Sequence, residues 1–94
     1  MQTPNDLSLK LEELAADYGA VCERLGTIGT GKAETWLKIR EGTTSDRQAD
    51  KLWEATLSGR EEVGLRWRER GLLRQMSAIR TRLRVLSDEV KNMY

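Results

Sequence analysis

An apolar stripe with the spacing of a coiled coil runs through the last stretch of the chain, residues 72–94. Its members follow one another at steps of four and three residues: Leu72, Met76, Ile79, Leu83, Leu86, Val90 and Met93. This spacing places all of them on one side of a helix and predicts a coiled-coil seam. Because so narrow an apolar stripe is unfavourable in water, we expect a second helix to cover it, from this chain or from another copy.

A matching stripe near the N-terminus is the predicted partner. It comprises Leu7, Leu11, Leu14, Tyr18, Val21 and Leu25. Thr3 can cap a helix that begins at Pro4, and Asp6 lies near the positive end of its dipole. Gly26 follows the last apolar position and predicts the end of this helix.

The two stripes can be aligned as an antiparallel pair. One register places an apolar residue opposite an apolar one in every layer, including Leu7 opposite Val90, and brings Asp17 beside Arg82. Since a surface ion pair contributes only about 0–1 kcal/mol, the charged pair selects the register more than it stabilises the fold. A bare two-helix hairpin is marginally stable, so we expect a third layer from the middle of the chain or a pairing of two hairpins.

The middle of the chain predicts two further helices. Residues 33–41 predict a short helix that ends at Gly42. Ser45 and Gln48 have the spacing of a capping box, so we expect a helix to start again after Ser45.

Three glycines, Gly59, Gly64 and Gly71, interrupt the pattern of the last long helix. Each costs roughly 1 kcal/mol relative to alanine inside a helix, which predicts a kink or break between residues 58 and 71. Gly64 and Gly71 lie seven residues apart on one face, where they would let another helix approach closely.

The predicted fold is therefore all-α, with residues 1–94 forming a single helical domain. Its main part is an antiparallel helical hairpin, or coiled coil, of about residues 4–25 with residues 72–93. A helical tip over about residues 33–70 contains the tryptophans. We expect these tryptophans to form a small core at the tip, with a role in stacking on a ligand or on nucleic acid as the alternative.

The residue inventory excludes much enzyme chemistry. The chain has no histidine and a single cysteine, Cys22, which excludes an intrachain disulfide, a zinc cluster and a Ser-His or Cys-His catalytic pair. Residues 26–33 contain most of a phosphate-binding loop, but Ala33 stands at its hydroxyl position, and a chain this short cannot build the parallel sheet that the motif requires. We therefore expect no enzyme, no cofactor and no metal site.

The formal net charge of +1 hides an asymmetry between the two ends. Residues 1–31 carry two basic and five acidic side chains, whereas residues 60–94 carry nine basic and five acidic ones. Either the two ends attract each other, or the basic end faces nucleic acid.

Arginines on the last helix are the strongest candidates for a binding surface. The candidate residues for binding a protein partner or nucleic acid are Arg66, Arg68, Arg70, Arg74, Arg84, Trp36, Trp53 and Trp67. Their cationic field is interrupted by Glu61, Glu62 and Glu69, which weakens the case for nucleic acid.

Parts of the C-terminal half, residues 51–56, 71–73 and 77–86, resemble small helical coiled-coil proteins encoded by bacteriophages. The resemblance implies a phage accessory protein that inhibits or redirects host machinery, anti-defence inhibitors being one class, and a location in the host cytoplasm. It brings no functional motif with it.

Together these observations predict a non-enzymatic protein-binding module. The alternative is a nucleic-acid-binding protein that uses the basic face from Arg66 to Arg84. A homodimer is a further arrangement that the apolar stripes allow. No apolar run reaches the roughly 18 residues that a membrane span needs, so we expect no membrane contact.

Overall fold

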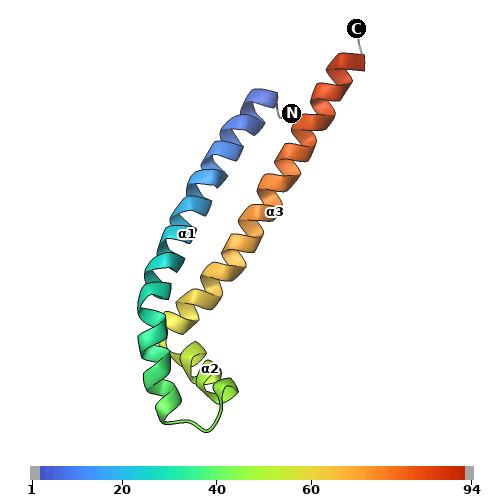
Figure 1. The fold of residues 1–94 in the computed structure, drawn as a ribbon. Helices are drawn as coiled ribbons and strands as arrows, with labels where there is room; N and C mark the ends of the chain where they lie inside the picture. The colour runs from blue at the N-terminus through green and yellow to red at the C-terminus, as the bar shows by residue number, and fades with distance from the viewer. Residues whose placement is uncertain (1–2, 93–94) are drawn as a thin grey trace.

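A computed structural model describes residues 3–92, which form three α-helices: α1 (Pro4–Glu41), α2 (Asp46–Ala55) and α3 (Leu57–Asn92) (Figure 1). The two long helices run antiparallel along an elongated molecule of 68 × 20 × 18 Å. The short helix α2 packs at the end where the chain turns back. The predicted all-α hairpin is confirmed; Met93, the last position of the C-terminal stripe, lies outside the described residues.

Thr3 caps α1, as its sequence predicts, and the structure adds a reciprocal bond from Asp6 that completes a capping box. The Thr3 hydroxyl accepts the Asp6 backbone N–H at 3.1 Å, and the Asp6 carboxylate accepts the Thr3 backbone N–H at 3.1 Å. These two groups satisfy backbone donors that the first helical turn leaves unpaired. The bond from the Thr3 backbone, followed by the one with its side chain, lowers the pKa of Asp6.

The predicted end of the first helix at Gly26 is wrong. α1 continues through Gly26 and includes the short helix expected over residues 33–41, and its C-cap is Gly42, as predicted. The physical reason is that the apolar stripe also continues: Leu25 and Ile28, on either side of Gly26, are both buried. Their burial outweighs the roughly 1 kcal/mol that one interior glycine costs.

The predicted cap of α2 is present with one difference. The Ser45 hydroxyl accepts the Gln48 backbone N–H at 3.2 Å. The Gln48 side-chain oxygen, however, accepts the backbone N–H of Thr44 rather than that of Ser45, at 3.1 Å. The Gln48 side chain therefore reaches back one residue further than in a standard capping box, where it would accept the backbone N–H of the N-cap residue.

The break between α2 and α3 lies at Thr56, before the expected range of residues 58–71. The Thr56 hydroxyl donates to the Trp53 carbonyl at 2.6 Å and accepts the Gly59 backbone N–H at 3.0 Å. It thus ends one helix and caps the next. Gly59 is needed there, because a Cβ atom at this position would lie 1.9 Å from the Trp53 carbonyl oxygen.

The hydrophobic core lies between the two long helices. Its buried members are Leu14, Val21, Leu25, Leu72 and Met76, against which Leu11, Tyr18, Leu65 and Ile79 pack with partial burial. The core therefore combines the N-terminal stripe from Leu11 to Leu25 with the first part of the C-terminal stripe, and Leu65 extends it.

The register between the two stripes differs from the prediction. Asp17 lies 4.0 Å from Arg68 rather than beside Arg82, which is fourteen residues further along the chain. As a result α3 extends past the beginning of α1 (Figure 1), and Val90, predicted to cover Leu7, is 55% exposed. A heptad pattern matches apolar to apolar at several offsets, so the stripes alone leave the register open. The joint at Thr56 determines the register, because α3 begins directly after this residue and there lies beside the middle of α1.

A second ion pair across this interface connects Arg24 and Glu61. The hydrogen bonds from the Arg24 guanidinium lower the pKa of Glu61 below its ordinary value of 4.5. A group whose pKa is lower in the folded protein stabilises it above the unfolded pKa and loses this effect as the pH falls through the folded pKa.

We therefore expect Glu61→Gln to lower the unfolding temperature at neutral pH and to flatten its decrease below about pH 4.5. Glu12→Gln, at an exposed position of α1, is the matched control. Thermal unfolding followed by circular dichroism between pH 3 and pH 7 measures both variants. If the unfolding temperatures of the two variants fall equally as the pH is lowered, the Arg24–Glu61 contact is contradicted.

Candidate functional site

A second regular stripe runs along α3, on the side turned away from the core. Its members follow steps of four and three residues: Arg60, Gly64, Trp67, Gly71, Arg74, Ala78, Thr81 and Val85. We call this set the α3 outer stripe. All of its members are exposed except Gly71, which is half-buried. It is a second potential helix-packing surface, and α1 and α3 do not use it to pack against each other.

Trp67 is the largest side chain of the α3 outer stripe. It is 64% exposed, and the Arg70 guanidinium carbon lies 5.2 Å from the centroid of its ring. This cation–π contact holds the arginine beside the ring and gives the surface a combined aromatic and cationic character. The expectation that Trp67 belongs to a tryptophan core at the tip is wrong, because α3 continues unbroken and presents this ring to solvent.

Trp53 does form the core of the tip. It is 4% exposed, and its indole N–H donates to Glu62 at 3.2 Å. Lys32 binds the same carboxylate oxygen at 2.9 Å and lies 5.5 Å from the centroid of the Trp53 ring. Burial raises the pKa of Glu62, but the hydrogen bonds from Lys32 and Trp53 outweigh it, and the net shift is downward. These contacts tie all three helices together.

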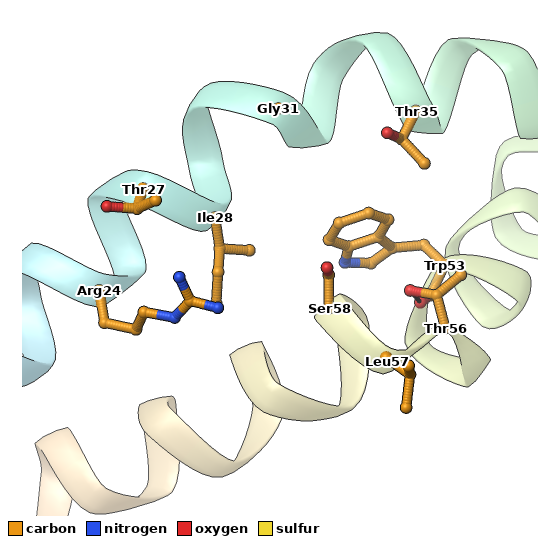
Figure 2. Close-up of a pocket in the computed structure, with 9 residues that line it drawn as sticks. All are labelled: Arg24, Thr27, Ile28, Gly31, Thr35, Trp53, Thr56, Leu57 and Ser58. Atoms are coloured by element: carbon orange, nitrogen blue, oxygen red, sulfur yellow. Dashed lines mark hydrogen bonds between the residues drawn. The ribbon is translucent and has the colours of Figure 1, made fainter.

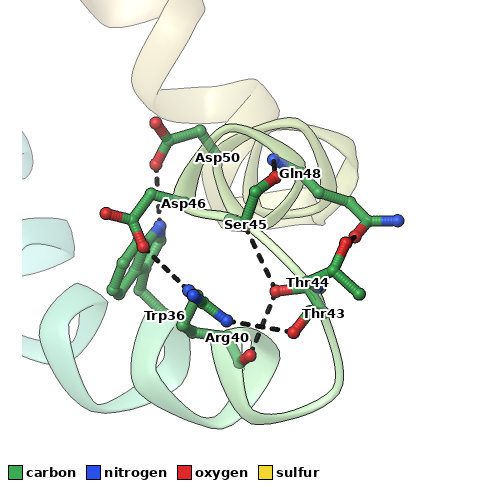
Figure 3. A network of polar contacts seen from close by, with 8 residues as sticks. All are labelled: Trp36, Arg40, Thr43, Thr44, Ser45, Asp46, Gln48 and Asp50. Carbon is green, nitrogen blue, oxygen red and sulfur yellow. Dashed lines mark hydrogen bonds and ion pairs between the residues drawn. The ribbon is translucent and has the colours of Figure 1, made fainter.

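Trp36 also lies at the tip, where polar contacts close the loop before α2 (Figure 3). Its indole N–H donates to Asp50 at 2.8 Å. Arg40 donates to Asp46 at 2.8 Å and to the Thr43 carbonyl at 3.0 Å. Trp36 and Trp53 are therefore brought together as parts of the scaffold, while Trp67 stands apart on the outer side of α3.

The candidate arginines divide into paired and outward-facing ones. Arg66 binds Glu69 at 3.4 Å on its own helix, and Arg68 binds Asp17 of α1. Arg70 lies over Trp67, and Arg74 and Arg84 are exposed.

The carboxylates that interrupt the basic run in the sequence are largely engaged elsewhere. Glu61 and Glu62 turn toward α1, where they bind Arg24 and Lys32. Only Glu69 remains close to the basic surface, in its pair with Arg66. The outer side of α3 is consequently more cationic than the sequence suggests.

A cavity of about 400 Å³ opens between α1 and the joint of α2 with α3 (Figure 2). It is lined by Arg24, Thr27, Ile28, Gly31, Thr35, Trp53, Thr56, Leu57 and Ser58. Its charged side chain, Arg24, is already bonded to Glu61, and the Thr56 hydroxyl is used in the cap of α3. These residues serve the joint between the helices, so we do not assign them to a ligand.

The sequence contains a signal for the α3 outer stripe that hydrophobicity alone misses. Gly64 and Gly71 share one helix face, and Trp67 lies between them at heptad spacing. Glycine and arginine do not count as apolar, so a search for apolar residues finds only the core stripe.

Two further classes of site are absent from the part of the chain that the structure covers. Within residues 3–92, no group of three or more acidic or cysteine side chains could hold a metal ion. Over the same residues, no helix is both long and apolar enough to cross a bilayer.

No protein-family model, no curated protein and no solved structure matches this chain.

Proposed function

We propose that this chain is a protein-binding module whose docking surface is the α3 outer stripe. The observation that carries the proposal is Trp67, a large aromatic ring that is 64% exposed at the middle of a regular helical stripe. Tryptophan and arginine are the residues that most often dominate the binding energy of protein interfaces. Burying this ring against a partner would remove a large apolar surface from water.

The spacing of the stripe favours a helical partner. Steps of four and three residues match the contacts that one helix makes with another. Gly64 and Gly71 lie on either side of Trp67, and a Cβ atom at either position would meet nothing within 4 Å. They leave room for a partner side chain close to the backbone of α3.

The charge of the surface defines the partner further. Arg60, Arg70 and Arg74 lie along or beside the stripe, so the fitting partner is a helix whose apolar face is flanked by acidic residues. A role in blocking or redirecting host machinery stays a prediction that depends on the phage resemblance alone.

The binding experiment compares the wild-type chain with Trp67→Ala in a pull-down from the natural host, with affinities measured for any captured protein. We expect Trp67→Ala to weaken binding at least about tenfold, because it truncates the central anchor of the surface. The fold should be retained, since the ring is mostly exposed.

Leu37→Ala is the matched control, because this leucine is 58% exposed but lies on α1 near the tip. It should bind like the wild type. If Trp67→Ala captures the same proteins at the same affinity, the proposed surface is wrong.

A second candidate function, nucleic-acid binding, is favoured by one observation. The carboxylates of Glu61 and Glu62 are engaged with α1, which leaves the arginines near Trp67 as a cationic surface around an exposed aromatic ring. Such a combination suits single-stranded nucleic acid, whose bases stack on aromatic rings. Binding to a single-stranded oligonucleotide that does not weaken between low and moderate salt would count against this candidate.

A further inference from the structure

The charge asymmetry between the two ends of the sequence is used little by contacts within the chain. Residues 1–31 are acidic overall and residues 60–94 are basic overall, and the hairpin brings α1 and α3 alongside each other (Figure 1). Within residues 3–92, however, the one ion pair between an acidic side chain of α1 and an arginine of α3 joins Asp17 and Arg68, at 4.0 Å. Attraction between the two ends of one chain therefore accounts for little of the asymmetry.

Free acidic groups lie on a second outer stripe, on α1. Its members follow steps of four and three residues and are all exposed: Asn5, Leu9, Glu12, Ala16, Gly19, Glu23, Gly26 and Thr30. We call this set the α1 outer stripe. It lies on the side of α1 opposite the core residues Leu14, Val21 and Leu25. No ion pair among residues 3–92 engages Glu12 or Glu23.

Free basic groups lie on the α3 outer stripe. Arg60 and Arg74 belong to this stripe, and Arg70 lies beside it, over the Trp67 ring. In the described part of the chain, none of these three arginines takes part in an ion pair. The two long helices therefore present outer stripes with the same repeat and with opposite charge.

The two outer stripes also differ in the size of their side chains. The α3 outer stripe carries Trp67 at its middle, whereas the α1 outer stripe carries Ala16 and Gly19 between its two glutamates. Small residues let a large ring lie close to a helix backbone without leaving a gap. The α1 outer stripe therefore offers an indole ring a shallow surface with a carboxylate on either side.

We propose that the partner of the α3 outer stripe is the α1 outer stripe of a second copy of this chain. This inference rests on the proposed function, because it names the acid-flanked helix that fits that surface. Trp67 packs on Ala16 and Gly19 of the second copy, whose Glu12 and Glu23 face the arginines near the ring. Since a surface ion pair contributes little, the ring supplies most of the affinity and the charges select the partner face.

The same charges disfavour pairing of either stripe with itself. Two α3 outer stripes would bring Arg60, Arg70 and Arg74 of one copy against those of the other. Two α1 outer stripes would bring Glu12 and Glu23 against their equivalents. Like charges that face each other across an interface suppress such pairings, so the contact between unlike stripes is favoured.

This contact does not close at two chains. The two outer stripes lie on opposite sides of the hairpin, so a second copy that covers α3 leaves α1 of the first copy free. A contact between two different surfaces repeats from copy to copy. In sedimentation equilibrium we therefore expect the average mass of the wild-type chain to rise past that of a dimer with increasing concentration, and to fall again when salt is added. A mass that stops at two chains would indicate a twofold contact and overturn the inference.

Complementary charge reversal tests which surfaces meet. One variant carries Arg70→Glu with Arg74→Glu, and the other carries Glu12→Lys with Glu23→Lys. Each variant alone should associate at least about tenfold more weakly than the wild type, because its two outer stripes no longer have opposite charge. In a mixture, the intact α1 outer stripe of the first variant meets the intact α3 outer stripe of the second. The mixture should therefore form heterodimers that stop at two chains.

Arg47→Glu is the matched control, because this exposed arginine lies on α2, away from both outer stripes. It should associate like the wild type, and circular dichroism should show that every variant keeps its helices. Self-association of the Glu12→Lys, Glu23→Lys variant at wild-type strength overturns the inference, because its unchanged α3 outer stripe must then bind another surface. A mixture of folded variants that stays monomeric also overturns it.

The outcomes separate this inference from the proposed function. A wild-type chain that is monomeric at every concentration overturns the second copy as the partner, while loss of another captured protein by Trp67→Ala still supports the docking surface. If Trp67→Ala changes neither self-association nor capture, both proposals are wrong.

Discussion

Replacing Gly59 with alanine is expected to destabilise the protein by roughly 2–4 kcal/mol. The added Cβ atom would lie 1.9 Å from the Trp53 carbonyl oxygen and 2.9 Å from the Cα atom of Glu54. These neighbours belong to the backbone, so they cannot rotate away as a flexible side chain could. The end of α2 would have to move off the start of α3. Denaturant unfolding followed by circular dichroism measures the loss.

Gly64→Ala is the matched control for this prediction. The position lies in the same helix, but an added Cβ atom would meet nothing within 4 Å. We expect alanine there to stabilise the fold by about 0.5–1 kcal/mol through its helix propensity. Equal shifts in the same direction for both variants would contradict the close joint between α2 and α3.

Truncating Leu14 to alanine is expected to cost about 2–5 kcal/mol of unfolding free energy. Leu14 is 4% exposed and belongs to the core with Leu72 and Met76. Its removal leaves a cavity at the centre of the contact between the two long helices. In a domain of this size, each kcal/mol corresponds to roughly 4–8 °C in unfolding temperature, so the loss is readily measured.

Leu9→Ala removes the same atoms from an exposed position of α1. Leu9 is 52% exposed, and we expect the unfolding free energy to change by no more than about 0.5 kcal/mol. A loss for Leu9→Ala as large as that for Leu14→Ala would mean that α1 presents a different side to α3.

The local features of this fold could be predicted because short-range chemistry determines them. Thr3 and Asp6 form the cap of α1, Gly42 ends that helix, and Ser45 caps α2, all within a few residues of each other in sequence. The identity of the two core stripes follows from periodicity for the same reason. These features depend little on the rest of the molecule.

The register and the helix ends near glycine could not be predicted in the same way. A heptad stripe repeats, so the pairing of Asp17 with Arg82 is as regular as the observed pairing with Arg68. The choice depends on the joint at Thr56, whose geometry involves both neighbouring helices. The prediction that the first helix ends at Gly26 was wrong because Ile28, beyond this glycine, is also buried.

The candidate site was predicted in part. The sequence singled out Trp67 and Arg70, and the structure brings them into contact on one exposed surface. It also singled out Trp36 and Trp53, which instead support the tip. Sequence alone could not separate these roles, because exposure depends on where α2 ends and α3 begins.

The indole N–H signals of the three tryptophans offer the most direct test of the claim that the α3 outer stripe is a docking surface. Trp36 and Trp53 donate theirs to Asp50 and Glu62 inside the tip, whereas Trp67 lies on the stripe. In nuclear magnetic resonance spectra recorded as a captured partner is added, we expect the Trp67 signal to move and the other two to stay in place. Movement of the Trp36 and Trp53 signals with a stationary Trp67 signal would contradict the account.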